Sequence, residues 1–181
     1  MIVWDTETTG LILPSSADQL KQPRIIDFAA IQLDPFTGEE VNRIETLLMP
    51  EMLVPAEITK ITGYTDADLK DAPLFAEVLP GIVDFFLGET CMLAHNLSFD
   101  KAMLYYELLR LDAVTAFPWP PMQLCTVQLF ESEFGKFPKL TALYERKLGR
   151  KLEQRHTAMA DVEALVEIVR AEKLYELAQP N

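Results

Sequence analysis

The first ten residues, MIVWDTETTG (1–10), set the interpretation of the whole chain. Residues 1–4 are apolar and end at Asp5, and a Thr-Thr-Gly segment (8–10) then breaks the pattern, so we expect a buried strand followed by a turn. Side chains two residues apart on a strand share a face, so Asp5 and Glu7 can converge on one point. Such a pair suits a hard divalent cation, although two solvated acids at a strand end are the simpler interpretation of this motif alone.

The segments that follow predict an α/β fold. Residues 25–33 and 41–49 have strand patterns and flank 34–38, DPFTG, which has hairpin chemistry, so the first three strands are expected to be antiparallel. Residues 14–23 are expected to form an exposed loop. Apolar runs and helical periods in the remaining sequence predict strands at 91–95 and 123–126 and helices at 74–86, 97–111, 139–148 and 158–177. A hairpin followed by interleaved helices indicates a mixed five-stranded sheet flanked by helices.

Composition limits the classes of function. The chain has 181 residues, 49% of them hydrophobic, which fits one domain with a single core. No apolar run reaches the roughly 18 residues that cross a bilayer, so no membrane association is expected. A formal net charge of −12 argues against coating nucleic acid through a basic face, but it is compatible with a cleft where bound cations hold a few nucleotides.

The N-terminus and the cysteines indicate a cytoplasmic protein. Residues 1–5 show no basic region and no cleavage site of a secretory signal. Cys91 and Cys125 lie in apolar surroundings without metal-ligand spacing, as is typical of core cysteines in a reducing compartment.

A second motif, AHNLSFD at 94–100, places an acid at the start of a helix that follows a buried strand. There Asp100 either complements the helix dipole or faces the ligand crevice at the strand ends of an α/β sheet. Asn96 can cap this helix, contact a substrate, or do both.

A third motif, HTAMAD at 156–161, pairs a histidine with an acid. Five residues within one helix would turn His156 and Asp161 about 140° apart. The two therefore face one cleft only if His156 lies in the loop and Asp161 on the second turn of the following helix.

Together the motifs form a pattern that none of them has alone. Five residues stand at expected strand or helix ends, and both histidines of the chain fall inside the motifs; the five are Asp5, Glu7, Asp100, His156 and Asp161. This set resembles the DEDDh, or DnaQ-like, exonucleases, a family that includes the proofreading epsilon subunit of bacterial DNA polymerase III. Segments 124–126 and 139–140 also resemble the family's connecting segments. The resemblance implies an RNase H-like fold and a single exonuclease domain over residues 1–181.

The resemblance gives each of the five residues a role. It implies two divalent cations, Mg²⁺ or Mn²⁺, one held by Asp5, Glu7 and Asp161, the other by Asp5 and, largely through water, Asp100. It makes His156 the general base, a role that an ordinary imidazole pKa of about 6.5 suits near neutral pH. The implied reaction removes nucleoside monophosphates from the 3′ end of single-stranded or frayed DNA. Activity is expected to fall below about pH 6, as His156 becomes protonated.

The resemblance also places residues against the substrate. Backbone N–H groups around 8–10 would receive the terminal hydroxyl or phosphate, and Leu11 would pack on a base. The full set of implied substrate-binding residues is Thr8, Thr9, Gly10, Leu11, His95, Asn96 and Phe99. Thr62 departs from the family, because some relatives have a substrate-contacting histidine there. Nearby Tyr64 has two interpretations, stacking on a base or ordinary packing.

Alternatives remain within the same fold. RNA is a candidate substrate, because RNA-trimming relatives share this constellation and the sequence does not locate contacts to a 2′-hydroxyl. A DNA polymerase is a candidate partner, although the end of the chain at Asn181, soon after the last expected helix, favours a free-standing nuclease or a module without a tether. A basic group either binds an incoming strand or solvates a helix end; it consists of Arg146, Lys147, Arg150 and Lys151.

Overall fold

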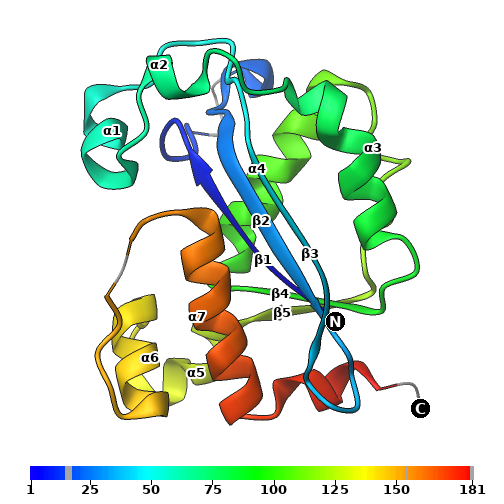
Figure 1. Cartoon of the computed structure of the whole chain (residues 1–181), viewed down its shortest axis with the longest axis vertical. Coiled ribbons are helices and arrows are strands. Elements are labelled where there is room, and N and C mark those ends of the chain that lie inside the picture. Colours follow the sequence, from blue (N-terminus) through cyan, green and yellow to red (C-terminus); the bar gives the residue numbers. More distant parts are fainter. Residues whose placement is uncertain (15–17, 154, 180–181) are drawn as a thin grey trace.

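The computed structural model describes residues 1–14, 18–153 and 155–179. A five-stranded sheet in the order β3-β2-β1-β4-β5 runs through its centre (Figure 1). The strands are β1 (Ile2–Thr8), β2 (Ile25–Leu33), β3 (Glu40–Leu47), β4 (Cys91–Ala94) and β5 (Met122–Cys125). β1, β2 and β3 pair antiparallel, whereas β4 runs parallel to β1 and β5 parallel to β4. The expected mixed sheet with three antiparallel strands is confirmed.

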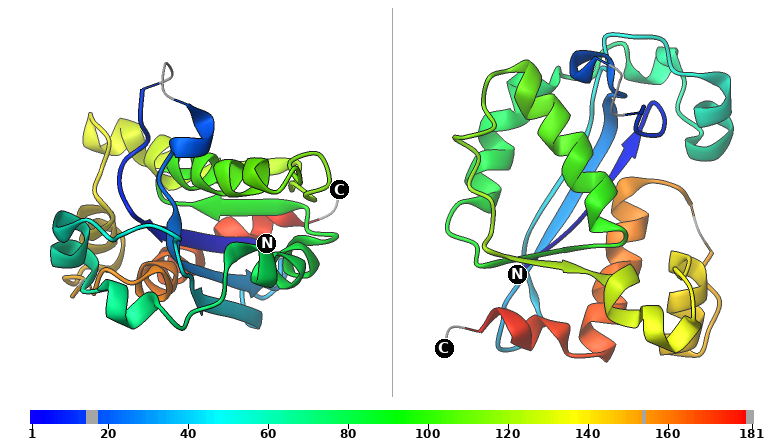
Figure 2. Two further views of the ribbon diagram at one scale, coloured as in Figure 1. Left: turned by 90° about the horizontal axis from the view of Figure 1, so that it is seen from above. Right: turned by 180° about the vertical axis from the view of Figure 1, so that it is seen from behind.

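Helices cover both faces of this sheet, as Figures 1 and 2 show. The helices are α1 (Ala56–Thr62), α2 (Asp66–Leu69), α3 (Phe75–Phe86), α4 (Leu97–Arg110), α5 (Thr126–Phe134), α6 (Leu140–Leu148) and α7 (Ala158–Ala171), with 3₁₀ turns η1 (Gln19–Lys21) and η2 (Leu174–Ala178). One buried cluster joins the sheet to α6 and α7, and a second joins it to α3 and α4. None of the helices in the described ranges is long and apolar enough to span a membrane.

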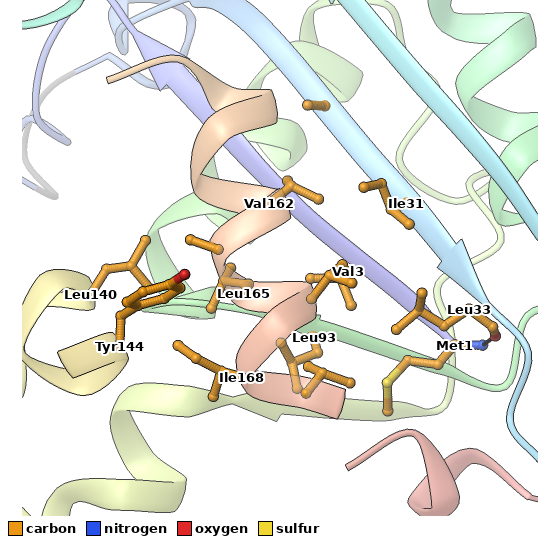
Figure 3. Close-up of a cluster of buried hydrophobic side chains, with 14 of the residues drawn as sticks. Met1, Val3, Ile31, Leu33, Leu93, Leu140, Tyr144, Val162, Leu165 and Ile168 are labelled. Atoms are coloured by element: carbon orange, nitrogen blue, oxygen red, sulfur yellow. Dashed lines mark hydrogen bonds between the residues drawn. The ribbon is translucent and has the colours of Figure 1, made fainter. Parts of the chain in front are cut away.

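The alternation of side chains along β1 divides these two cores. Met1 and Val3 pack on the α7 side, whereas Ile2 and Trp4 pack on the α3–α4 side. Figure 3 shows the first of these clusters, in which side chains of β1, β2 and β4 meet those of α7; among the residues drawn are Val3, Ile31, Leu93, Val162, Leu165 and Ile168. The same alternation, continued to the end of β1, sends Asp5 and Glu7 toward α7 and Thr6 toward α4.

The C-terminal segment differs from the expected helix over 158–177. α7 ends at Ala171, and Lys173 adopts a left-handed conformation (φ 52°) before η2 begins. Tyr175 in η2 packs against the α7-side core, and its ring lies so close to Gly38 that a Cβ there would come within 2.7 Å of it. Burial of this ring explains the break, because a continued helix would carry Tyr175 away from the hairpin turn.

One smaller expectation also changes. The expected exposed loop at 14–23 is exposed at Pro14 but buried at Gln22 and Pro23, since the Gln22 side chain bonds the backbone of Leu13. Its residues 15–17 lie outside the described ranges. The two cysteines, by contrast, are buried and free as the composition predicts: Cys91 and Cys125.

Candidate active site

Three carboxylates meet where β1 ends beside the start of α7. Asp5, Glu7 and Asp161 each offer one oxygen, and these oxygens all lie within 4.8 Å of one another. We call these three residues the acidic cluster. Asp161 lies in the first turn of α7, not the second, because Thr157 caps this helix and the helix begins at Ala158. The arrangement joins the first and third motifs of the sequence in space.

Burial shapes the charge of this site. Burial, followed by the charges of Asp161 and Asp27, raises the pKa of Glu7 to about 8. Burial, then the charges of Asp100 and Asp161, raises the pKa of Asp5 well above its ordinary value. Within the part of the chain that the structure describes, neither Asp5 nor Glu7 forms an ion pair. Crowded carboxylate oxygens of this kind are the donor set that Mg²⁺ or Mn²⁺ prefers, so the residues present fit a divalent cation.

Asp100 lies apart from the acidic cluster. It belongs to the first turn of α4 and is buried, and its Oδ1 accepts hydrogen bonds from the Thr6 backbone N–H (3.1 Å) and the Thr6 hydroxyl (2.8 Å). Burial raises the pKa of Asp100 to about 7, although both bonds from Thr6 work to lower it. Thr6 points to the α4 side of the sheet while its neighbours point to the α7 side. Asp100, the fourth acid, therefore reaches the end of β1 from the opposite face of the sheet. Of the neighbouring charges, that of Asp100 raises the pKa of Asp5 the most.

A pocket of about 480 Å³ opens beside these acids. Its polar lining includes five of the residues singled out in the sequence motifs: Asp5, His95, Asn96, His156 and Asp161. Its other wall is formed by Val127 and residues 137–141. His156 lies in the loop just before α7, where it has a left-handed backbone (φ 52°) and a half-buried side chain. His156 and two members of the acidic cluster, Asp5 and Asp161, thus face one cavity of a size that suits a small ligand.

His95 uses both of its ring nitrogens inside the protein. Nε2 lies 3.1 Å from the Pro138 carbonyl oxygen, which can only accept, so Nε2–H donates there. Nδ1 then accepts from the Thr126 hydroxyl at 2.8 Å. Burial lowers the pKa of His95. The ring is therefore held neutral and fixes the pocket wall at Pro138.

A comparison of the sequence with models of known protein families gives a match. A family model described as an exonuclease matches residues 2–169. The chain belongs to this exonuclease family. The resemblance drawn from the sequence motifs is thereby confirmed.

Relatives and solved structures agree with this assignment. A PolC-type DNA polymerase III of Clostridium perfringens is 29% identical over 170 residues, which cover 93% of this chain and 11% of that protein. A DNA polymerase III epsilon subunit of Treponema pallidum is 34% identical over 105 residues, which cover 58% of this chain and 44% of that protein. The chain thus spans less than half the length of either relative. The nuclease domain of 3′hExo, a DEDDh family member bound to rAMP, shares the fold, with a TM-score of 0.71, 18% identity and coverage of 99% and 94% of the two chains.

The turn after β1 in this exonuclease-family chain is held more tightly than its sequence predicts. The Thr9 N–H donates to the Arg24 carbonyl (2.9 Å), and the Thr9 hydroxyl accepts from the Arg24 N–H (2.9 Å). The Thr8 hydroxyl donates to the Gly10 carbonyl (2.8 Å). The expectation that backbone N–H groups here receive the substrate is therefore wrong for Thr9, whose N–H already has a partner. Leu11, by contrast, is 80% exposed and stays available for contact.

The residues of the second motif, 94–100, lie in different surroundings. Asn96 takes the N-cap position of α4 in a left-handed conformation (φ 62°), but its side chain makes no capping bond and instead accepts from the Ser98 hydroxyl (3.2 Å). Asn96 thus stands at the predicted cap position without a side-chain capping bond. It is also exposed and lines the pocket, so its contact with a substrate stays a prediction. Phe99 is half-buried and packs against the α3–α4 core.

The basic group after α6 is partly neutralised within the protein. Lys147 pairs with Glu133 (2.8 Å) and Glu172 (3.1 Å), and Arg150 pairs with Glu167. Two of its four members thus form ion pairs with neighbouring helices, which favours the interpretation of a solvated helix end over a strand-binding patch.

One residue near the site was missed from the sequence. Asp27 lies in β2 directly opposite Glu7 and is fully buried. Its Oδ2 accepts from the Tyr64 hydroxyl (3.0 Å) and the Ala158 backbone N–H (3.0 Å). A signal was available, because an acid inside the apolar run IIDFAA (25–30) is unusual for a strand buried on both faces. The Tyr64 hydroxyl is thus committed inside the protein, and Thr62 is buried in the same turn.

Proposed function

We propose that residues 1–181 form one exonuclease domain that removes nucleoside monophosphates from the 3′ end of single-stranded or frayed DNA. The observation that supports this most directly is the acidic cluster, whose oxygens lie within 4.8 Å of one another beside a pocket that His156 also lines. The two buried free cysteines of the chain are compatible with a cytoplasmic location, which is also part of the proposal.

Two divalent cations, Mg²⁺ or Mn²⁺, are part of the proposal. Asp5, Glu7 and Asp161 would hold one of them, and Asp5 with Asp100 would support the other. Bound there, the cations supply an activated water and stabilise the charge on the attacking and leaving oxygens of the phosphodiester. Asp5 and Glu7 belong to β1, and Asp161 belongs to α7. The ligands of the first cation would therefore come from two rigid elements, which fixes the place of reaction.

His156 is the proposed general base. It lies in the pocket wall, outside the acidic cluster, at the loop that leads into α7. From that position its imidazole can accept a proton from a water held between it and the carboxylates. The substrate contacts proposed around it come from Leu11 and Asn96, which are exposed, and from the pocket wall that His95 fixes.

DNA is the substrate that we favour, because two relatives similar in sequence are named as DNA polymerase III proteins. Those names also support a DNA polymerase as partner, with the chain acting as its proofreading activity. RNA is the second candidate, since the nuclease domain that shares this fold over 99% of the chain was solved with rAMP.

The test uses 5′-labelled single-stranded DNA and RNA of one sequence, with Mg²⁺ or Mn²⁺. We expect a ladder that shortens DNA from its 3′ end, stops at a 3′-terminal phosphorothioate, and disappears with EDTA and in Asp5→Ala. Faster shortening of RNA would move the function to RNA processing. If Mn²⁺ binds but neither substrate is cleaved, the proposal of a free-standing exonuclease is wrong, and the assay is repeated with a polymerase present.

A further inference from the structure

Asp27 is a buried acid for which the proposed reaction has no role. Its side chain is 0% exposed, and within the described ranges it forms no ion pair. Oδ2 accepts two hydrogen bonds, while Oδ1 has no hydrogen-bond partner among the described residues. Burying a carboxylate in this state costs free energy that an apolar side chain of similar volume would not, so stability alone does not explain Asp27.

One of the two bonds fixes the beginning of α7. Ala158 is the first residue of that helix, and its N–H is one of the donors that a helix leaves without an internal partner. It lies two residues after His156 and three before Asp161 in the chain. A single 3.0 Å contact therefore ties the third motif to β2.

The same carboxylate also lies next to the first motif. In the antiparallel register of β1 and β2, Asp27 stands directly opposite Glu7. In the same ladder Asp5 stands opposite Ala29 and Thr6 opposite Phe28, and the register shifts only after this point, between Glu7 and Thr8. The position of Asp27 thus sets the separation between the β1 acids and the start of α7.

The second bond brings in a third segment. Tyr64 follows the left-handed Gly63 (φ 82°) that ends α1, and its half-buried hydroxyl donates to Asp27 Oδ2 at 3.0 Å. Figure 1 shows α1 and α2 lying beyond the ends of β1 and α7 that carry the site. The Tyr64 hydroxyl thus gives Oδ2 a second donor beside the Ala158 N–H, and two donors restrict the rotation of the carboxylate more than one does.

We propose that Asp27 is a positioning residue: its Oδ2 fixes His156 and Asp161 on α7 relative to Asp5 and Glu7 on β1, and the Tyr64 hydroxyl holds that carboxylate in place. The inference rests on the proposed function for its effect on hydrolysis, but its effect on metal binding can be measured without any substrate. Neither Asp27 nor Tyr64 touches the reacting atoms in this proposal.

The first experiment compares Asp27→Leu with Asp27→Asn in the full chain, with thermal unfolding as a check on folding. Leucine accepts no hydrogen bond, so Mn²⁺ affinity, measured by electron paramagnetic resonance, should fall about 10- to 100-fold. The kcat for a DNA oligonucleotide should fall about 100-fold while KM changes less than about threefold, because the reacting groups and not the substrate contacts are displaced. Asparagine keeps an acceptor oxygen for both donors, so Asp27→Asn should retain Mn²⁺ affinity and kcat to within about fivefold.

A second, milder variant guards against loss of folding. Tyr64→Phe deletes one hydroxyl at a half-buried position and should lower kcat and Mn²⁺ affinity about three- to tenfold, the worth of one ordinary hydrogen bond. Its matched control is Tyr144→Phe, which deletes a hydroxyl that donates to Glu167 (2.8 Å) on the far side of α7 and should change neither quantity.

The outcomes separate the two proposals. If Asp27→Leu folds and binds Mn²⁺ as the wild type does, the positioning role is overturned. If Asp27→Leu does not fold, Tyr64→Phe decides, and equality with Tyr144→Phe in Mn²⁺ affinity overturns it. A wild-type chain that binds Mn²⁺ but cleaves no nucleic acid, either alone or with a polymerase present, would refute the proposed function, while the Mn²⁺ comparison would still test Asp27.

Discussion

Two groups of acids in this molecule, the buried Glu107 and the half-buried pair Asp5 and Glu7, have different neighbours. Glu107 on α4 is 1% exposed, and its carboxylate accepts from Arg24 Nε (2.9 Å) and the Ile25 N–H (3.0 Å) and pairs with Arg110 (3.3 Å). At the end of β1, Asp5 and Glu7 share a small space and form no ion pair with any described residue. The protein itself supplies cations to Glu107, whereas Asp5 and Glu7 are proposed to bind theirs from solution.

The pKa values follow this difference. Burial works to lower the pKa of Arg24, but its bonds and charge interaction with Glu107 raise it overall, as expected for a satisfied pair. At the acidic cluster every interaction resolved for Glu7, beginning with burial, raises its pKa, which reaches about 8. Glu107, which is buried and ion-paired, thus marks a structural site, whereas Glu7, which is half-buried and has no ion pair among the described residues, belongs to a candidate metal site.

The largest effect expected from this contrast follows from neutralising one acid in each group. Asp5→Asn should lower hydrolysis by about 10⁴-fold or more, because the several kcal/mol of transition-state stabilisation that bound cations provide would be lost. Its unfolding temperature without metal should stay equal or rise, since a repelling charge is removed. Glu107→Gln should keep kcat within about twofold yet unfold roughly 5–10 °C lower, because a buried ion-pair group loses a partner.

Oligonucleotide hydrolysis and thermal unfolding of the two variants, measured side by side, check this. An Asp5→Asn protein that loses stability but keeps its activity would show that the two groups have been assigned the wrong way round.

A smaller effect separates His156 from the acids beside it. Because His156 has φ 52°, asparagine is the suitable replacement, since it tolerates the left-handed region better than most residues. His156→Asn should lower the single-turnover rate about 10²- to 10³-fold, the range of a lost general base. Mn²⁺ affinity should be unchanged, because the histidine lies outside the acidic cluster. A parallel loss of Mn²⁺ affinity would make His156 a metal ligand and remove it as the base.

The contrast also explains how far the sequence could be interpreted. The alternation that places Asp5 and Glu7 on one face is local and depends only on the strand period, so the pair could be predicted from ten residues. The loop position of His156 followed from the same kind of local geometry. The bonds that hold Asp100 to Thr6 and Asp27 to Ala158 join residues 94 and 131 positions apart, and no local pattern reports such partners.

Errors in the predicted elements have the same origin. The period over 158–177 is helical, but Lys173 turns the chain because Tyr175 packs at the hairpin turn, a contact made only in the folded protein. The bonds of His95 to Thr126 and Pro138 could likewise not be read from a motif that ends at residue 100, although His95 lines the pocket and its contact with a substrate stays a prediction. Tertiary contacts decided the helix break against the local signal.

The smallest expected effect concerns the stability of the metal-free protein as pH changes. The pKa values of Glu7 and Asp100 are raised to about 8 and about 7, so the folded state favours their protonated forms. The stability that these groups contribute is present below their ordinary pKa values near 4 and is lost as pH rises through 7 and 8. In EDTA, the unfolding temperature should therefore fall by roughly 5 °C between pH 5 and pH 8.

Calorimetry of three proteins at both pH values tests this expectation. Glu7→Gln should flatten the pH dependence, because one of the titrating groups is gone, whereas Glu107→Gln should retain it at a lower unfolding temperature. Adding Mg²⁺ at pH 8 should raise the unfolding temperature of the wild type back to its value at pH 5. The rise should be smaller for Glu7→Gln, because a ligand that binds only the folded state stabilises it more when its affinity is higher. An unfolding temperature that rises with pH in EDTA would mean that the acids at the end of β1 are already compensated by the protein, as Glu107 is, and the distinction between the two groups would not hold.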